Sequence, residues 1–470
     1  MSGSRPRGNL LSLGAVQVFR LLAGLAVNVL VMRWLGVEGY GVYGYVLTLV
    51  GLLSFGASLN MERLLQREIA REPERSGRLV GTGLVAVGAM SVLTTGVILA
   101  SAWVLDGRPT VMLAAGLGAL AMSLQALATI PVAWFHGRRD MKLSVPGSFL
   151  GRLMLVLGTL AFLVGLQWGV VGVFAAQVLD ALATLGVALF ILLRRLGFRA
   201  LGTSGAELRA LVKQALPFGM NLFFGSIYLS ADVLLLGELK DDLEVGIYRG
   251  AVLLISLFPI VANTLTNGVY PRMAKHLGQP EVAGAELGFV SRILLAISLP
   301  AAVGGMLTAE PLMVFLGGEE WGVSATCFLV LAPMLPLRFV NNGLGMTLSA
   351  LNHQQDRTRG VFLAAMLNLG LNVLAIPRFG AVGAAATTLI TEVGLALWFH
   401  WRVRPLVQGL GLLSSLARVA LPAAAMGLVV WLLPELHVLL LIGIGVGVYA
   451  PLALLTGAIR RDDPRRLRRV

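Results

Sequence analysis

Leu79 to Leu105 reads LVGTGLVAVGAMSVLTTGVILASAWVL, and none of its 27 residues is charged. An α-helix rises about 1.5 Å per residue, so this run can cross the roughly 30 Å hydrocarbon core of a lipid bilayer. Similar runs recur along the chain and predict an all-α integral membrane protein with about fourteen transmembrane helices. They are residues 10–32, 39–60, 79–105, 110–135, 145–166, 170–193, 214–237, 246–271, 287–309, 323–351, 359–377, 381–401, 416–433 and 437–457.

The composition agrees with a membrane protein. Of the 470 residues, 57% are hydrophobic and 13% are charged, about half the charged share of a typical soluble domain. The net charge of +13 does not indicate a nucleic-acid partner, because the basic residues recur between apolar runs instead of forming one patch. The single Cys327 excludes an internal disulfide bond. The first apolar run contains Arg20 and is too long for a signal peptide, so we expect it to remain as the first helix.

The distribution of basic residues predicts the orientation. With the N-terminus in the cytoplasm, the loops on that side hold 28 of the 37 Lys and Arg residues, and the loops on the other side hold 4. Such an excess marks the cytoplasmic side, so both termini are expected there. The tail Arg460–Arg469 could bind anionic lipids or only fix this orientation. The cytoplasmic stretches 61–72 and 204–215 have amphipathic helical spacing and could lie on headgroups or connect helix ends.

The sequence also repeats itself. At an offset of 205 residues, Gly41-Val-Tyr43 matches Gly246-Ile-Tyr248, and at an offset of 211, Trp168–Gly172 matches Phe379–Gly383. Because each half holds an even number of runs, the repeat is parallel, with two six-helix lobes related by a pseudo-two-fold axis along the membrane normal. Such duplications are typical of transporters. We predict a first lobe at 1–200, a second at 201–404, and two extra helices with a basic cytoplasmic tail at 405–470.

Polar residues inside the apolar runs are spaced to share helix faces. A charged group at bilayer depth costs about 2.5–3.5 kcal/mol, so it usually faces a protein interior or a wet cavity. These faces could line a common polar cavity, or could form interhelical hydrogen bonds inside dry lobes. The candidates are Gln17, Arg20 and Asn28; Asn221 and Asp232; Arg249, Asn263 and Asn267; and Arg338, Asn341 and Asn342.

Arginines outnumber acids within the runs, which favours an anionic, phosphate-bearing cargo because guanidinium binds phosphate bidentately. Arg152, Arg249 and Arg292 lie nearer helix ends than Arg20 and Arg338, so their side chains could instead reach the headgroups. The acids Asp180, Asp232 and Glu392 could pair with the arginines, bind a coupling proton or Na⁺, or only support helix packing.

No Walker-type loop, zinc-binding spacing or Cys–His arrangement is present in the sequence. The stretch Gly36–Gly41 superficially resembles a dinucleotide fingerprint, but it joins two apolar runs and follows no strand, so we interpret it as a tight turn. We therefore expect no metal, no other cofactor and no enzymatic activity.

Several short motifs resemble those of polysaccharide-export flippases. Gly36-Val-Glu-Gly-Tyr-Gly41 resembles their "LGxxxYG" turn, and Arg67-Glu-Ile-Ala70 resembles their "lvReia" segment. Leu216-Pro-Phe218 with Asp232–Gly237 resembles their "lPf…iDxxxLG" helix, and Gly380–Ala385 resembles their "GxxGAA" sequence. In order and spacing the chain resembles a Wzx-type lipid-linked oligosaccharide flippase of the multidrug/oligosaccharidyl-lipid/polysaccharide exporter superfamily.

This resemblance implies a cargo of oligosaccharide on polyprenyl pyrophosphate. The cargo would cross a bacterial or archaeal cytoplasmic membrane by alternating access, for O-antigen, capsule or exopolysaccharide assembly, coupled to an ion gradient. Arg20 and Arg338, with Arg249 and Arg152, would hold the pyrophosphate. Gln17, Asn263, Asn267, Asn341 and Asn342 would contact sugar hydroxyls. Expected partners are membrane lipids and, by the same resemblance, a polysaccharide polymerase and its chain-length machinery.

Three other functions remain open at this stage. A drug exporter of the same superfamily usually has twelve helices and carries cations, which fits the runs 416–433 and 437–457 and the arginine surplus poorly. A lipid II-type peptidoglycan precursor flippase is a close relative with fourteen helices, and the motifs favour the polysaccharide branch only weakly. A membrane polymerase or ligase would be expected to carry a large outer loop with acids or His, and no outer loop exceeds about 14 residues.

Overall fold

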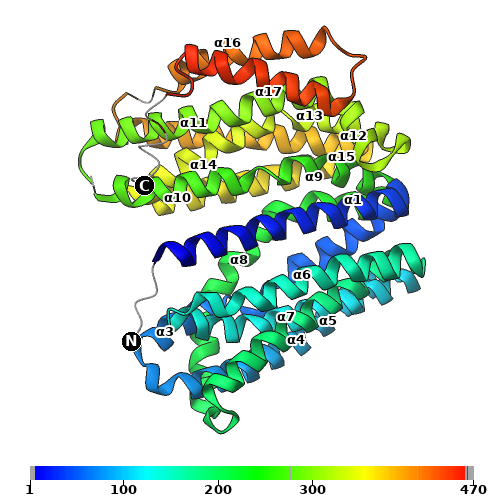
Figure 1. The fold of residues 1–470 in the computed structure, drawn as a ribbon, viewed down its shortest axis with the longest axis vertical. Coiled ribbons are helices and arrows are strands. Elements are labelled where there is room, and N and C mark those ends of the chain that lie inside the picture. The colour runs from blue at the N-terminus through cyan, green and yellow to red at the C-terminus, as the bar shows by residue number, and fades with distance from the viewer. Residues whose placement is uncertain (1–5, 276, 410, 461–462, 464–470) are drawn as a thin grey trace. The chain divides into compact units, whose positions relative to one another are not determined.

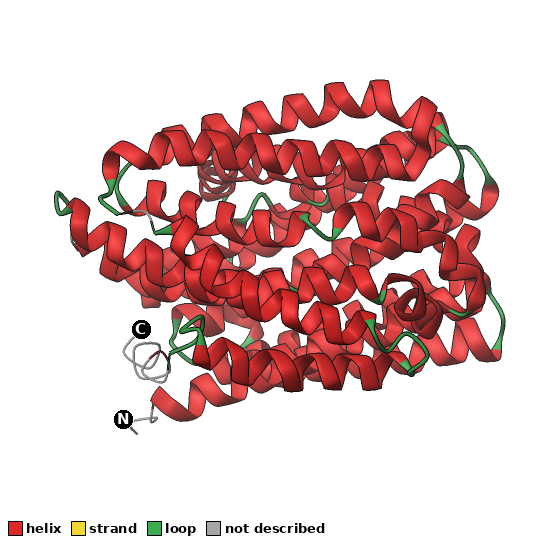
Figure 2. Cartoon of the chain, turned by 90° about the horizontal axis from the view of Figure 1, so that it is seen from above, coloured by secondary structure: helices red, strands yellow, loops and turns green. Residues whose placement is uncertain are grey.

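The computed structural model describes residues 6–275, 277–409, 411–460 and 463. The elements within these residues are helices joined by short loops (Figure 1 and Figure 2). Backbone contacts divide the chain into two compact units, residues 1–238 and 239–470. The predicted all-α membrane fold is confirmed, and the predicted lobe boundaries after residues 200 and 404 stay a prediction.

The first unit is built from long helices joined by short turns. Helix α5 packs against α4 and α7, and α6 packs against α7 and α1. Several of these helices are joined by single helical turns. These are 3₁₀ turns at 73–75, 141–144 and 198–200 and a π-helical turn at 160–165. The α-helices are α1 (Pro6–Leu53), α2 (Phe55–Ser58), α3 (Met61–Arg71), α4 (Ser76–Leu105), α5 (Pro109–Gly137), α6 (Val145–Thr159), α7 (Gly169–Leu196) and α8 (Gly205–Leu239).

The amphipathic helix predicted at 61–72 is α3, and its apolar face is covered by protein. Leu65 and Ile69 are fully buried in a core that also contains Ile130, Phe135 and Leu192, from α5 and α7. The arginines on the opposite face of α3 are exposed. Since the apolar face is already buried, α3 connects helix ends and does not need lipid headgroups to cover its apolar residues.

The second unit has its own set of packed helices. Helix α14 packs against α10, α11 and α15. Helix α16, orange in Figure 1, packs against α11 and against α17, which is red. Single 3₁₀ turns lie at 319–323 and 404–406. The α-helices are α9 (Asp242–Ser256), α10 (Pro259–Lys275), α11 (Pro280–Leu307), α12 (Ala309–Gly317), α13 (Ser324–Leu331), α14 (Met334–Ala350), α15 (Gln354–Val403), α16 (Leu412–Trp431) and α17 (Val438–Leu455).

Two glycines break helices that would otherwise be too long for one span. Helix α1 is kinked at Gly36 (φ 67°) and α15 at Gly380 (φ 55°), a region of backbone space that favours glycine. At about 1.5 Å per residue, each helix is roughly twice as long as the hydrocarbon core is thick. The turn predicted at Gly36–Gly41 and the break predicted between runs 359–377 and 381–401 are therefore confirmed, and no dinucleotide-type loop forms at Gly36.

The break between runs 145–166 and 170–193 is also confirmed. It lies at Gln167 (φ 54°) and Gly169 (φ 59°), where the Trp168 ring stacks on Phe162 at a centroid distance of 5.0 Å. Gly169 and Gly380 are the residues that the 211-residue offset matches, and both have a positive φ. The two repeats thus share this local conformation, while the symmetry of whole lobes stays a prediction.

Two of the predicted transmembrane helices are bent, and a third is longer than expected. The run 246–271 divides into α9 and α10 with a 43° bend, and the run 323–351 divides into α13 and α14 with a 44° bend. Pro259 and Pro333 lie at these bends, because proline lacks the amide hydrogen that a continuous helix needs. The amphipathic stretch 204–215 and the run 214–237 form one helix, α8.

The described residues contain nine helical stretches long and apolar enough to cross a membrane, or eleven if each bent pair is one span. Two of these stretches, Phe19–Arg71 and Gln354–Leu406, are 53 residues long and include the kinks at Gly36 and Gly380. The chain is therefore a multi-pass membrane protein. The count of fourteen spans stays a prediction.

The Gly380 kink yields a stability prediction. A Cβ atom at this position would lie 2.5 Å from the Glu244 carboxylate, whose Oε2 accepts a 2.6 Å hydrogen bond from the Ala381 amide. We expect Gly380→Ala to lower the free energy of unfolding by about 1–3 kcal/mol, through backbone strain and loss of this contact. Thermal unfolding of the detergent-purified protein measures the change.

Gly370→Ala is the matched control for this prediction. Gly370 lies in the same helix α15, and a Cβ atom added there would meet no other atom within 4 Å, so it should tolerate alanine without loss of stability. Equal melting temperatures for Gly380→Ala and the wild type would refute the proposed strain.

A polar recess in the first unit

Two adjoining recesses lie within the first unit, between α1, α5, α6 and α7. One has a volume of about 320 Å³ and includes Gln17 and Arg20 in its lining. The other has a volume of about 360 Å³ and includes Asn28. Both are lined by Gln125, Arg152 and Asp180, so the two recesses meet at these three polar side chains. We call the two recesses together the Arg20 recess.

The Arg152–Asp180 ion pair forms where α6 packs closely on α7. The Arg152 Nη1 atom is 3.2 Å from Asp180 Oδ2, and the Thr184 hydroxyl donates to Asp180 Oδ1 at 3.3 Å. The Asp180 side chain is only 6% exposed. A Cβ atom on Gly151 would collide with Asp180 and Thr184, so glycine is needed for this approach of the two helices. A buried carboxylate requires such a partner, because an unpaired charge away from water is costly.

Arg20 has a different environment in the same recess. Its side chain is exposed, and it forms no ion pair with any of the residues that the structure describes. Arg20 and Arg152 both interact with the single acid Asp180, so these three groups together keep one net positive charge in the recess. The recess also contains Glu62, at the expected cytoplasmic end, 3.9 Å from the His136 ring. The acid at that end therefore has a neighbour of its own and is not the partner of Arg20.

Asn28 is held by its own helix. Its amide nitrogen donates to the Gly24 carbonyl at 2.9 Å, and its amide oxygen accepts from the Tyr40 hydroxyl at 2.9 Å. Tyr40 lies beyond the Gly36 kink, so this hydrogen bond links the two arms of α1. Asn28 therefore lines the recess and also fixes the kink.

The second unit contains another buried ion pair. The Arg338 Nε atom donates to Glu392 Oε1 at 2.9 Å, and Asn341 donates to the other carboxylate oxygen at 2.8 Å. Glu392 is 2% exposed. Asn342 faces another helix, α10, where its amide donates to Asn263 at 2.8 Å and accepts from Thr266 at 3.2 Å. Asn341 and Asn342 are adjacent on α14, but their side chains belong to two different polar clusters.

The remaining predicted residues lie outside these groups. Arg249 is half-buried in α9, and its Nε atom has no hydrogen-bond partner among the described residues. Asn267 is exposed in α10, and Asp232 is buried in α8. The side chain of Asn221 lies outside the described residues. That the polar faces of all four predicted helices line one common cavity stays a prediction.

The interpretation that Arg152 and Arg292 reach toward headgroups is wrong. Arg152 pairs with Asp180, and Arg292, which is 5% exposed, binds both carboxylate oxygens of Asp463 at 2.8 and 2.7 Å. Both arginines have buried carboxylate partners, which hold them inside the protein. The rest of the basic tail, residues 461–462 and 464–470, lies outside the described residues.

Sequence reasoning missed several polar residues that line the Arg20 recess, among them Gln125, Gln177, Glu62 and His136. Two of them had a usable signal. Gln125 is a polar residue inside the apolar run 110–135, and Gln177 precedes Asp180 by three positions and so shares its helix face. Glu62 and His136 come from segments that are far apart in sequence and are both predicted to be cytoplasmic, and no local spacing predicts that they meet.

A second cavity, in the second unit, is apolar. It has a volume of about 800 Å³, and its lining comes from α11, α14, α15 and the start of α16. Its polar side chains are His400 and Ser414, and the rest of its lining includes Leu295, Leu299 and Leu337. This cavity differs in chemistry from the Arg20 recess, since its described lining offers no charged lysine, arginine or acid.

Comparisons with known proteins give consistent results. Residues 7–277 match the family described as polysaccharide biosynthesis protein, and residues 217–374 match the MatE family. A protein of Haloferax volcanii named as a low-salt glycan biosynthesis flippase, Agl15, is 23% identical over 378 residues, covering 78% of this chain and 77% of its own. A protein of Escherichia coli K12 named as an O-antigen transporter is 23% identical over 408 residues, covering 82% and 94%.

Solved structures share the fold. The lipid II flippase MurJ, in an inward closed conformation, has a TM-score of 0.75 at 14% identity and covers 95% of this chain and 98% of its own. An inward-facing multidrug resistance transporter of the MATE family has a TM-score of 0.66 at 15% identity and covers 85% and 98%. The matched residues 7–277 make up more than half of the sequence, so the chain belongs to the polysaccharide biosynthesis protein family.

Proposed function

We propose that this protein is a flippase that moves oligosaccharide linked to polyprenyl pyrophosphate across the cytoplasmic membrane. The observation that carries the proposal is Arg20, an exposed arginine that forms no ion pair with the described residues and lies in a polar recess, near the start of the first membrane-spanning stretch. Such a residue is costly in a membrane and usually marks a substrate path. The relatives named as a glycan flippase and an O-antigen transporter support the same cargo class.

In the proposed mechanism, Arg20 donates hydrogen bonds to the pyrophosphate, because guanidinium matches phosphate oxygens in geometry and charge. Gln17 and Gln125 line the recess and offer amide groups to sugar hydroxyls. Arg152 is neutralised by Asp180, so it positions the recess wall and contributes less to anion binding. The two units would expose the bound head to each side of the membrane in turn, while the prenyl chain stays in lipid.

Several further features stay proposals. Transport would use a proton or Na⁺ gradient, with Asp180, Asp232 and Glu392 as the candidate acids. No covalent chemistry is required of the protein. Both termini would lie in the cytoplasm of a bacterium or archaeon, and a polysaccharide polymerase with its chain-length machinery would use the exported units.

A reconstitution with three cargoes tests the function. Liposomes would carry the purified protein and a fluorescent polyprenyl-pyrophosphate glycan, a lipid II analogue or a cationic dye. A membrane-impermeant quencher would report the exposure of each lipid, and dye efflux would be followed directly. We expect movement of the polyprenyl-pyrophosphate glycan. Movement of the lipid II analogue alone, or of the dye alone, would replace the proposal by the corresponding relative's activity.

A further inference from the structure

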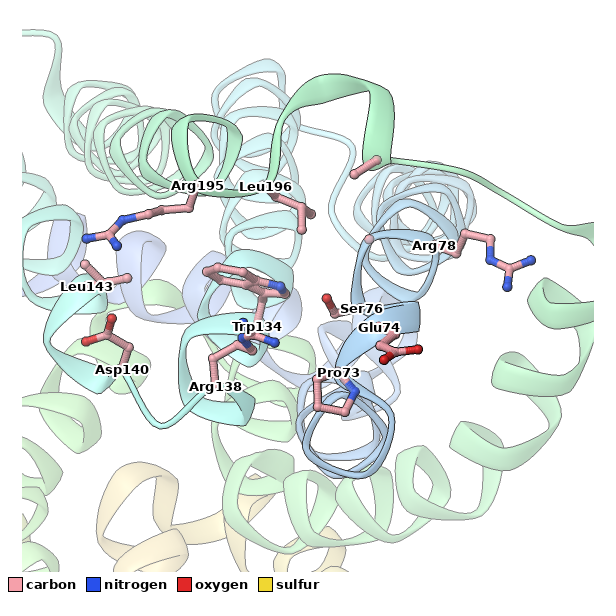
Figure 3. A pocket seen from close by; sticks show the side chains of 12 residues that line it. Pro73, Glu74, Ser76, Arg78, Trp134, Arg138, Asp140, Leu143, Arg195 and Leu196 are labelled. Atoms are coloured by element: carbon pink, nitrogen blue, oxygen red, sulfur yellow. The ribbon is translucent and has the colours of Figure 1, made fainter. Parts of the chain in front are cut away.

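A separate basic cavity lies at the expected cytoplasmic end of the first unit. It has a volume of about 630 Å³ and shares no described lining residue with the Arg20 recess. Its walls come from the start of α4, the end of α5 with the turn that follows, and the end of α7 (Figure 3). We call it the Trp134 cavity, after the side chain at its centre.

Close backbone packing builds one wall of the Trp134 cavity. The segment after α7 passes directly over the first turns of α4. A Cβ atom on Gly77 would collide with the Ala200 carbonyl oxygen, and one on Gly81 would collide with the Gly202 carbonyl oxygen. Both glycines are buried. The wall therefore depends on two positions where only glycine fits, which makes it a defined part of the fold.

Charged side chains surround the Trp134 cavity, with arginines in excess over acids. Arg78, Arg138 and Arg195 line it together with Glu74 and Asp140. Within the described part of the chain, none of the three arginines forms an ion pair. Figure 3 shows Arg138 beside Trp134, while the guanidinium groups of Arg195 and Arg78 point away from the ring on opposite sides. The Arg138 guanidinium lies 5.8 Å from the centre of the Trp134 ring.

Trp134 itself carries an unused hydrogen-bond donor. The residue is 7% exposed, and its Nε1 atom is buried without a hydrogen-bond partner among the described residues. A buried indole N–H normally finds an acceptor, because leaving it unpaired is unfavourable. The charged neighbour placed beside it is an arginine, which is also a donor. Trp134 lines the cavity, so a small turn of its ring that uncovers the Nε1 atom would let an acceptor from outside the chain bind both groups.

We propose that the Trp134 cavity binds a phosphate-ester anion. The Trp134 N–H and the Arg138 guanidinium would donate to its phosphate oxygens, and Arg195 would add positive charge. Glu74 and Asp140 would accept hydrogen bonds from hydroxyl groups on the esterified alcohol. An anionic phospholipid headgroup and a soluble phosphate ester share this chemistry. The cytoplasmic leaflet is rich in the former. The site is distinct from the proposed transport path, so it stands whether or not the flippase function holds.

Binding to the purified full-length protein in detergent tests the proposal. Short-chain phosphatidylglycerol, short-chain phosphatidylcholine and glycerol 3-phosphate would each be titrated, and the dissociation constants measured by microscale thermophoresis. We expect saturable binding of phosphatidylglycerol, weakened about tenfold or more by Arg138→Gln and by Trp134→Phe. Phenylalanine keeps the ring and removes only the N–H donor. Arg138 is exposed, so its variant should fold even if a change at Trp134 does not.

Arg139→Gln is the matched control, because Arg139 lies in the same turn and outside the described lining of the cavity. It should bind as the wild type does. If glycerol 3-phosphate bound as tightly as phosphatidylglycerol, the natural ligand would be a soluble phosphate ester. If phosphatidylglycerol bound and glycerol 3-phosphate did not, the ligand would be the lipid headgroup. Phosphatidylcholine bound as tightly as phosphatidylglycerol would overturn the proposal. So would unchanged phosphatidylglycerol binding by Arg138→Gln.

Discussion

Arg20→Gln is expected to reduce the transport of polyprenyl-pyrophosphate glycan by at least about tenfold while leaving the protein as stable as the wild type. A hydrogen bond to a charged group contributes roughly 1.5–3 kcal/mol, which corresponds to a factor of about ten or more. Stability should not change, because Arg20 is exposed and forms no ion pair with the described residues that would be broken. The liposome quenching assay measures transport, and thermal unfolding in detergent measures stability.

Two further variants separate charge from geometry at this position. Arg20→Lys keeps the positive charge but loses the planar guanidinium group that binds phosphate bidentately. Its transport rate should therefore lie between those of the wild type and Arg20→Gln. Arg63→Gln removes one exposed arginine from α3, outside the described lining of the recess, and should transport normally. Wild-type transport by Arg20→Gln would discard Arg20 as the site, whatever the identity of the cargo.

Arg152→Gln is expected to show the opposite pattern, with a large loss of stability. Removing Arg152 leaves the buried Asp180 carboxylate without its cation, which costs about 3–5 kcal/mol in comparable buried pairs. Thermal unfolding in detergent should therefore begin at a clearly lower temperature than for the wild type. The double variant Arg152→Gln/Asp180→Asn also replaces the second partner. It should recover most of the stability that Arg152→Gln loses, because no buried charge remains.

The double variant makes this prediction specific to the ion pair. If Arg152→Gln lowered the melting temperature and the double variant lowered it further, the loss would come from packing of the side chains and not from an uncompensated charge. Arg338→Gln, in the second unit, should also be destabilising, since Glu392 is buried and bonded to Arg338 and Asn341. The two pairs lie in different compact units, so their effects should be close to additive.

Local sequence signals predicted the backbone breaks well. Gly36, Gly169 and Gly380 each lie between apolar runs, and each adopts a positive φ. The run lengths also predicted a membrane protein, since lipid imposes a minimum length on each span. Pro259 and Pro333 lie at the two bends, so the positions of prolines inside apolar runs also indicate where a helix is interrupted.

The partners of the polar residues were harder to predict. Arg338 and Glu392 are 54 residues apart, and Arg292 and Asp463 are 171 apart, so no local spacing connects them. Helical periodicity indicates which residues share a face, but it does not tell which neighbouring helix that face meets. For this reason Asn341 and Asn342, adjacent in sequence, could not be assigned in advance to separate clusters on α15 and α10.

The bond between Arg292 and Asp463 also constrains the order of events during biosynthesis. Helix α11 enters the membrane 171 residues before its counter-charge is made. At roughly 5–20 residues per second, translation needs on the order of ten to thirty seconds to cover that distance. During this interval the Arg292 side chain lacks its carboxylate partner, and water or lipid headgroups can satisfy it instead. The second unit therefore reaches its final packing only after Asp463 has been made, 171 residues after Arg292.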